Sequence, residues 1–168
     1  MIHKKLTGLP TWRNVARPMA SNTSDWVLDV NVLVYAYIAQ TSAQQQCKAW
    51  LEATLQDPGK TVWLPTATRL GFVRLLGSGI VTQQPVPFVL LHDYLDTLAQ
   101  QGAKESLPGV NHATFWRIAT GVIGTKGNDI TDSHMAATAM ELNATLATCD
   151  KGFARFTGLK VFDPSALL

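Results

Sequence analysis

The stretch Trp26-Val-Leu-Asp-Val-Asn-Val-Leu-Val-Tyr-Ala-Tyr-Ile38 decides how this chain folds. It is apolar or aromatic throughout except for Asp29 and Asn31. The residues up to Leu28 indicate a short buried strand, and those from Val30 onward change to helical spacing. Because an ionised carboxylate is costly to bury without partners, Asp29 must become neutral, accept hydrogen bonds or bind a cation at this strand–helix junction.

Strands and helices alternate along the rest of the chain. The sequence pattern predicts strands over residues 26–28, 61–64, 145–148 and 160–162, and helices over residues 30–40, 43–54, 65–77, 87–100, 111–123 and 131–142. Each strand is short and apolar, as in a sheet that is covered on both faces. We therefore expect an α/β layer fold with a mainly parallel central sheet. In such a sheet, functional sites form at the carboxyl ends of the strands.

The length and composition fit one compact domain. A chain of 168 residues with 46% hydrophobic and 15% charged residues can bury a single substantial core. Since no segment approaches about 18 consecutive apolar residues, we expect no membrane span, and the N-terminus lacks the apolar stretch of a signal peptide. Cys47 and Cys149 lack metal-finger spacing and are interpreted as reduced thiols of a cytoplasmic protein.

The net charge of +2 is unevenly distributed. Residues 1–24 contain four basic residues and no acid, whereas residues 25–168 contain ten basic and twelve acidic residues, a net charge of −2. We therefore divide the chain into a basic N-terminal extension, 1–24, and a mildly acidic domain, 25–168. The acidic body excludes the broad basic surface of a duplex-DNA binder. The extension is interpreted as a solvated tail, with contact to RNA as the alternative.

Three acidic residues stand where a strand ends or a helix begins. Asp29 follows the first predicted strand, Asp132 lies in the first turn of the helix over 131–142, and Asp150 follows the strand over 145–148. Carboxylates that converge raise one another's pKa values, and a hard divalent cation relieves that repulsion. The pattern therefore predicts one pocket in which these three acids hold Mg²⁺, or Mn²⁺, for metal-assisted hydrolysis of a phosphodiester.

Each acid also has an ordinary structural interpretation. Asp29 could cap the helix that follows it, and an Asp at the end of a strand, such as Asp150, is common in turns. Asp129 precedes Asp132 by three residues and suits the capping position of their helix, with an auxiliary role in the pocket. Thr148 could donate a hydrogen bond to the carboxylate of Asp150 or to a bound water. Capping and metal binding are compatible, and the sequence leaves both open.

Other catalytic chemistries lack their motifs in this chain. It contains no phosphate-binding P-loop, no dinucleotide-binding glycine motif and no nucleophile elbow. Its four histidines show no paired spacing of metal ligands, and His134 is interpreted as packing on its helix. Arg74 could steer a phosphate group, with a structural ion pair as the equal alternative.

Several motifs resemble those of a known family. They are Val27-Leu-Asp-Val-Asn-Val-Leu-Val-Tyr-Ala36, Gly71-Phe-Val-Arg-Leu75, Asn128-Asp-Ile-Thr-Asp-Ser-His-Met-Ala-Ala137 and Ala144-Thr-Leu-Ala-Thr-Cys-Asp-Lys-Gly-Phe-Ala-Arg-Phe156. In their order and spacing, these motifs make the region from Trp26 to Pro164 resemble PIN-domain proteins. Among these, it resembles more closely the VapC toxin ribonucleases of bacterial toxin–antitoxin pairs.

The resemblance implies a PIN-like three-layer α/β/α fold over residues 25–168, with a short and mainly parallel sheet. It implies a metal-dependent endoribonuclease that cuts structured RNA such as transfer or ribosomal RNA. The implied cofactor is Mg²⁺, with Mn²⁺ as a substitute, bound by Asp29, Asp132 and Asp150, with Asp129 as an auxiliary residue. It further implies a homodimer and a cognate antitoxin protein that covers the acidic cleft.

One position departs from the family pattern. PIN-domain proteins commonly carry a Glu just ahead of Phe-x-Arg in the helix after the second strand, where this chain has Gly71. The site therefore has one formal negative charge fewer, which favours weaker metal affinity. Gly71 motivates one alternative to a toxin, a weakly active RNA-binding PIN domain. A housekeeping RNA-processing nuclease that has no antitoxin is a separate alternative.

Overall fold

The computed structural model of the protein describes residues 24–122, 124 and 126–166. The predicted basic extension, 1–24, lies outside these residues except for Ser24, which opens the first strand. The ordered elements of the domain therefore begin one residue before the predicted boundary at 25.

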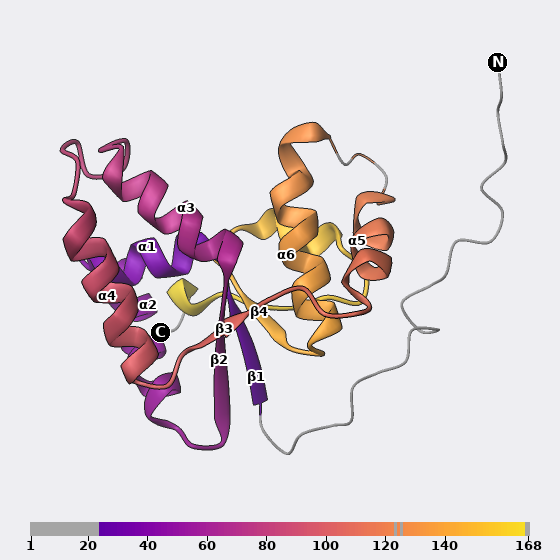
Figure 1. Cartoon of the computed structure of the whole chain (residues 1–168), viewed down its shortest axis with the longest axis horizontal. Helices are drawn as coiled ribbons and strands as arrows, with labels where there is room; N and C mark the ends of the chain where they lie inside the picture. The colour runs from indigo at the N-terminus through magenta and orange to yellow at the C-terminus, as the bar shows by residue number, and fades with distance from the viewer. Residues whose placement is uncertain (1–23, 123, 125, 167–168) are drawn as a thin grey trace, which may run out of the picture.

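A parallel sheet of five strands forms the centre of the described structure (Figure 1). In sheet order, the strands are β3 (Lys104–Ser106), β2 (Lys60–Pro65), β1 (Ser24–Leu28), β4 (Thr145–Ala147) and β5 (Lys160–Phe162). Every neighbouring pair is parallel, which confirms the predicted α/β fold. Because β1 is the central strand, Asp29, which follows it, lies at the middle of the carboxyl edge of the sheet.

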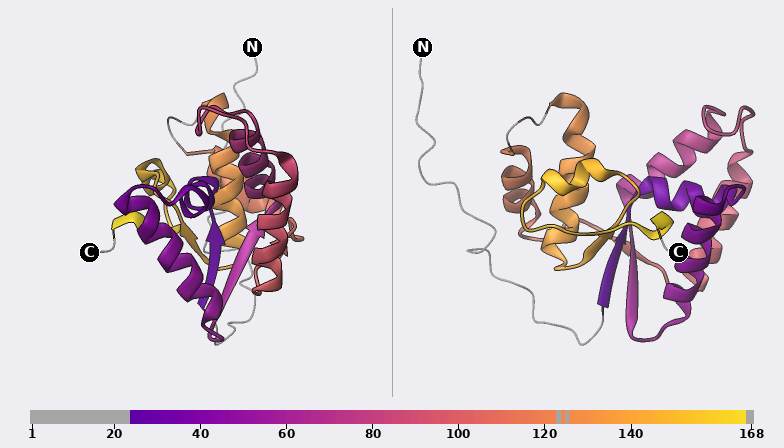
Figure 2. Two further views of the ribbon diagram at one scale, coloured as in Figure 1. Left: turned by 90° about the vertical axis from the view of Figure 1, so that its left-hand side faces the viewer. Right: turned by 180° about the vertical axis from the view of Figure 1, so that it is seen from behind.

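Helices cover both faces of this sheet. The described residues form six α-helices: α1 (Val30–Ile38), α2 (Ser42–Gln56), α3 (Thr66–Gly77), α4 (Phe88–Gln100), α5 (His112–Thr120) and α6 (Ile130–Glu141). Helices α1 to α4 gather on one side of the sheet and α5 and α6 on the other, as the front and back views show (Figures 1 and 2). This is the expected three-layer α/β/α arrangement. Within the described residues, no helix has the length and apolar character needed to cross a membrane.

Two apolar cores hold the layers together. The larger core lies between the sheet and α1 to α4, and Leu33 and Phe72 are wholly buried in it. The smaller core joins α6 to β4, where Ala136 and Ala139 pack near Leu146. Because the alanine side chains are short, α6 can approach the sheet closely. That approach fixes where the acidic first turn of α6 lies relative to the strand ends.

The helix predicted over residues 111–123 is α5, which ends at Thr120, and residue 123 lies outside the described residues. Two other elements also differ from the prediction. The strand β3 was not predicted, because its sequence Lys-Glu-Ser is polar and lacks the apolar signature of a buried strand. It is an edge strand that pairs only with β2, so the tertiary pairing defines it. Pro65 was expected to be the first residue of α3, but it has an extended backbone (φ −59°, ψ 148°), ends β2 and precedes the helix.

Candidate active site

The carboxyl ends of β1 and β4 bring the first predicted site residues together. The two strands run side by side with Leu28 opposite Ala147. The backbone N–H of Asp29 donates to the carbonyl of Ala147 at 3.0 Å. The residues that leave the two strands, Asp29 and Thr148, are therefore neighbours although 119 positions separate them in the sequence.

Three hydrogen bonds hold the carboxylate of Asp29, which is only 7% exposed. Its Oδ1 accepts from the backbone N–H of Val30 at 2.6 Å, so Asp29 caps α1 as its structural interpretation predicted. Its Oδ2 accepts from Nδ2 of Asn31 at 2.7 Å and from the hydroxyl of Thr148 at 2.6 Å. The same carboxylate thus serves as a helix cap and faces the segment that follows β4.

The pKa of Asp29 shows that other carboxylates lie nearby. Burial is the main cause that raises this pKa above its ordinary value of 3.8, because it disfavours the ionised form. The hydrogen bonds from Thr148 and Val30 act in the opposite direction, and the negative charges of Asp132 and Asp150 raise the pKa further. The three predicted metal-site acids therefore share one electrostatic environment.

Asn31 links the first turn of α1 to the segment after β4. Its Nδ2 donates to the hydroxyl oxygen of Thr148 at 3.1 Å as well as to Asp29, and its Oδ1 accepts from the backbone N–H of Cys149 at 3.1 Å. Asn31 therefore makes one local hydrogen bond, to Asp29, and two hydrogen bonds to residues more than a hundred positions away. In the sequence, the only indication of this role was that Asn31 is a polar residue within an apolar run.

Thr148 has a different partner from the one proposed from the sequence. Its hydroxyl donates to Asp29 and not to the carboxylate of Asp150, and it accepts from the backbone N–H of Asp150 at 3.0 Å. The reason is the strand register, which places Thr148 directly beside Asp29. Thr148 is 1% exposed, so its hydroxyl is held in this position by surrounding protein.

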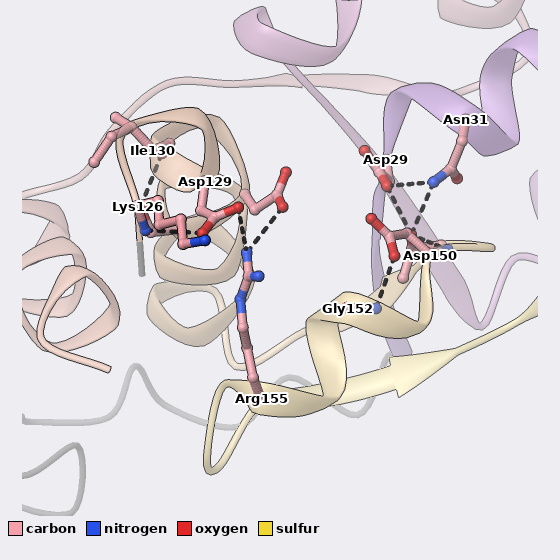
Figure 3. A network of polar contacts seen from close by, with 11 residues as sticks. Asp29, Asn31, Lys126, Asp129, Ile130, Asp150, Gly152 and Arg155 are labelled. Atoms are coloured by element: carbon pink, nitrogen blue, oxygen red, sulfur yellow. Dashed lines mark hydrogen bonds and ion pairs between the residues drawn. The ribbon is translucent and has the colours of Figure 1, made fainter. Parts of the chain in front are cut away.

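Asp150 lies beside Asp29 at the carboxyl edge of the sheet (Figure 3). Its Oδ1 accepts from the backbone N–H of Gly152 at 2.7 Å and so caps the short 3-10 helix η3 (Lys151–Arg155). This cap turns the chain away from β4 immediately after Asp150. Asp150 thus forms the turn after β4 and at the same time lies beside Asp29, so the two interpretations of Asp150 are compatible.

Asp129 and Asp132, at the start of α6, meet a cation that the sequence did not assign to the site. Nη2 of Arg155 donates to Oδ2 of Asp132 at 3.0 Å and lies 3.5 Å from Oδ1 of Asp129. Seen from behind, the C-terminal segment that carries η3 passes close to α6 (Figure 2). Arg155 was quoted in a motif without a role, because nothing in the sequence separates it from other exposed arginines.

The expected cap at Asp129 is formed differently. Asp129 occupies the capping position of α6, but its carboxylate makes no bond to that helix. Its Oδ2 accepts from the backbone N–H of Lys126 at 2.8 Å instead. The short 3-10 helix η2 (Gly127–Asp129) precedes α6 and turns the Asp129 side chain back towards Lys126.

The pKa of Asp132 is also raised, mainly by its partial burial. The positive charge of Arg155 lowers it, and the charges of Asp150 and Asp129 raise it. The structure thus places Asp29 and Asp150 side by side (Figure 3), while the carboxylate of Asp132 is paired with Arg155. In this arrangement, the residues that the structure describes include no group of three His, Cys, Asp or Glu side chains positioned to hold one metal ion.

The donor set nevertheless suits a hard divalent cation. Carboxylate oxygens are the ligands that Mg²⁺ and Mn²⁺ prefer. Burial and mutual repulsion both disfavour the ionised forms of Asp29 and Asp132, and a bound cation would remove that penalty. The residues therefore fit such a cation by donor type and by charge.

A model of the PIN domain matches residues 26–159, which include every acid described above. The chain belongs to the PIN-domain family.

Sequence relatives place this PIN domain near the VapC ribonucleases. Ribonuclease VapC43 of Mycobacterium tuberculosis is 35% identical over 134 residues, which cover 79% of this chain and 90% of VapC43. Ribonuclease VapC37 of the same organism is 31% identical over 145 residues, which cover 84% of this chain and 99% of VapC37. These similarities confirm the resemblance that the sequence motifs predicted.

Solved structures support the same fold. VapBC-1 from nontypeable Haemophilus influenzae superposes with a TM-score of 0.61 at 18% identity, covering 84% of this chain and 98% of the other. FitAcB from Neisseria gonorrhoeae gives a TM-score of 0.57 at 27% identity, covering 84% of this chain and 99% of the other.

Gly71, the residue that departs from the PIN-domain pattern, lies where α3 packs against α1. It lies in α3, and a Cβ added there would lie 3.0 Å from Cγ2 of Val30, the residue after Asp29. A larger side chain at this position would therefore push on the first turn of α1. With Gly71 in place of the Glu of the family pattern, α3 lies close to α1 at the edge of the site.

His134 packs within the PIN domain as expected. Its Nδ1 lies 2.9 Å from Nε2 of the buried His112, which joins α6 to α5. Burial, and next the neighbouring His112, lower the pKa of His134 below its ordinary value of 6.5. The imidazole therefore belongs to a helix–helix contact.

Proposed function

We propose that this VapC-type ribonuclease hydrolyses RNA phosphodiester bonds with Mg²⁺ or Mn²⁺ bound by Asp29, Asp132 and Asp150. One observation carries the proposal: at the carboxyl edge of a parallel sheet, burial raises the pKa of Asp29 and the charges of Asp132 and Asp150 raise it further, while burial and the charge of Asp150 raise the pKa of Asp132. Such convergence is unfavourable for folding alone and suits the binding of a cation.

The chain's own residues would divide the work as follows. Thr148 and Asn31 fix the orientation of Asp29, so its carboxylate is in place before a cation arrives. Asp150 is oriented by its cap on η3, and Asp132 projects from the first turn of α6. A bound divalent ion would lower the pKa of a water molecule and offset the negative charge of the scissile phosphate.

We further propose that the substrate is structured RNA, of the transfer or ribosomal class, and that a small antitoxin protein silences the enzyme. The antitoxin proposal is supported by the similarity to VapC proteins and by exposed apolar side chains at one end of the molecule. These side chains extend from the α3–α4 connection into the first turn of α4: Ile80, Phe88, Val89 and Leu90. A homodimer would cover such a surface as well.

Cleavage of defined RNAs tests the proposed chemistry. Purified protein is incubated with transfer RNA, a ribosomal RNA fragment and a single-stranded DNA of matched sequence, with Mg²⁺, Mn²⁺ or a chelator. We expect metal-dependent cuts in RNA alone. The variant Asp150→Asn keeps an acceptor for the Gly152 N–H and removes the charge, so it should lose cleavage while its melting temperature stays close to that of the wild type.

Asp96→Asn is the matched control, because Asp96 is an exposed acid on α4. It should cleave like the wild type. Cleavage that persists unchanged in Asp150→Asn would contradict the assignment of that residue, and cleavage that persists in the chelator would contradict metal dependence.

A weakly active RNA-binding PIN domain is the second candidate, and Gly71 is the observation that favours it. The lost acid leaves the site with one negative charge fewer than the family pattern. Calorimetric titration with Mn²⁺ separates the two candidates. Binding at micromolar concentrations supports the nuclease, whereas retention of RNA without Mn²⁺ binding supports the binding module.

A further inference from the structure

The two cysteines of the chain meet beside the active site. Cys47 in α2 and Cys149, which stands between Thr148 and Asp150, are separated by 102 positions, yet their Sγ atoms lie 3.7 Å apart. Both thiols are free. The two sulfur atoms come from distant segments and are in direct contact, so a small movement of the side chains can bring them to bonding distance.

We propose that Cys47 and Cys149 form a reversible disulfide whose closure alters the active site. A disulfide bond is about 2.05 Å long, so the sulfur atoms must approach by about 1.6 Å. Rotation about the Cα–Cβ bonds with a small shift of the chain around Cys149 supplies such a movement. Cys47 is wholly buried in α2, whereas Cys149 is partly exposed and follows β4, so we expect the movement to occur mainly in the segment around Cys149.

The exposure of the two thiols sets the order of the chemistry. Cys149 is partly exposed and meets a low-molecular-weight disulfide first, whereas Cys47 is shielded by the protein. The thiolate of Cys149 attacks one sulfur of the reagent, forms a mixed disulfide and releases one thiolate. The sulfur of Cys47 then attacks the sulfur of Cys149 and releases the second. Two protein thiols are oxidised, the reagent is reduced to two thiols, and the two protons pass to them.

The connection to the site runs through the backbone of Cys149. Its N–H donates to Oδ1 of Asn31, and Nδ2 of Asn31 donates in turn to Asp29 and Thr148. Drawing Cys149 towards α2 therefore strains the contacts that orient the carboxylate of Asp29. It also shifts Asp150, the next residue in the chain. This consequence for metal binding rests on the proposed function, while formation of the disulfide does not.

The disulfide is tested on the full-length protein with glutathione disulfide as the oxidant. We expect both thiols to disappear together, the intact mass to fall by two hydrogens, and a peptide map without reductant to show residues 47 and 149 cross-linked. Reductant should restore both thiols. The proposal fails if both thiols remain reactive, or if the wild type keeps glutathione on Cys149.

Two single variants separate the roles of the cysteines. Cys47→Ala should retain a glutathione adduct on Cys149, because no second thiol displaces it. Cys149→Ala should remain unmodified in the folded state, because Cys47 is buried. Rapid modification of Cys47 in that variant overturns the proposed order. If Cys47→Ala does not fold, Cys47→Ser provides the same readout with a side chain of similar size.

The effect on the site has its own readouts. The side-chain amide resonances of Asn31 should shift when the disulfide closes, and the Mn²⁺ affinity measured by calorimetry should fall about tenfold, which is about 1.4 kcal/mol. Unchanged Asn31 resonances overturn the coupling. If those resonances shift but neither redox state binds Mn²⁺, the coupling stands and the proposed metal-dependent function fails instead.

Discussion

The two halves of the active site are held in different ways. Around Asp29, buried and partly buried hydrogen bonds connect the carboxylate with Asn31 at 2.7 Å and with Thr148 at 2.6 Å, and Asn31 with Thr148 at 3.1 Å. At the start of α6, Asp129 and Asp132 instead face a single guanidinium group, and the side chains of this ion-pair cluster are between 23% and 32% exposed. The first half is therefore positioned by the ends of two strands, and the second by charge close to solvent.

The difference teaches which half is preorganised. Residues that follow paired strands inherit their positions from the sheet, so we expect Asp29 and Thr148 to keep their positions when a cation binds. Charge-based contacts near solvent are weaker and are screened by salt. We infer that the α6 half adjusts when a divalent ion replaces Arg155 as the partner of Asp132.

Substitution of Asp29 should have the largest effect. In Asp29→Asn, an amide NH₂ group replaces the oxygen that accepts from both Asn31 and Thr148. The new donor then faces two other donors in a buried site, which is unfavourable. We expect RNA cleavage to fall at least about 100-fold and the free energy of unfolding to drop by about 1–3 kcal/mol. Single-turnover cleavage and denaturant titration measure the two effects, with Asp96→Asn as the control. Retention of cleavage would place the catalytic centre elsewhere.

Removal of the Thr148 hydroxyl should have the next largest effect. Thr148→Val keeps the shape but removes the buried donor to Asp29, and we expect a loss of about 1–2 kcal/mol of stability and about tenfold in cleavage. Thr54→Val is the matched control, since Thr54 is equally buried and its hydroxyl donates only to the backbone of its own helix at Trp50. Equal losses of cleavage in both variants would contradict a positioning role for Thr148.

A smaller effect should appear in the pH dependence of stability. The pKa values of Asp29 and Asp132 are raised in the folded state above the ordinary value of 3.8. Their favourable contribution is therefore fully present below that value and is lost as the pH rises through the folded-state pKa values. Mn²⁺ should offset the loss, so it should raise the melting temperature at about pH 7 more than at about pH 4. Thermal unfolding with and without Mn²⁺ at several pH values measures this. An equal shift at every pH would contradict the assignment.

Replacement of Arg155 should have the smallest effect and the opposite sign. Arg155→Met removes the cation that competes for Asp132 and Asp129, so Mn²⁺ affinity measured by calorimetry should rise a few-fold, with the gain reduced by added salt. Arg69→Met is the matched control, because it breaks an ion pair of similar exposure with Glu105 outside the acid cluster. A fall in Mn²⁺ affinity in Arg155→Met alone would show that Arg155 supports the metal site instead of competing with it.

Much of the fold followed from local patterns. The short apolar runs predicted four of the five strands, and the change of periodicity after Asp29 predicted α1 at nearly its observed bounds. The edge strand β3 escaped prediction because its residues are polar and only its pairing with β2 makes it a strand. The three acids were likewise recognisable, since each stands at the end of a strand or the start of a helix.

The sequence by itself determined the parallel α/β layers, the PIN-domain motifs and the places of the acids at strand ends and helix starts, because these follow from local periodicity and residue order. The tertiary structure alone decided the distant partners: Thr148 for Asp29 and Asn31, Arg155 for Asp132, and Cys47 for Cys149. The physical reason is that such contacts join segments far apart in the chain. Which of them meet depends on strand register and on how closely the helices approach the sheet.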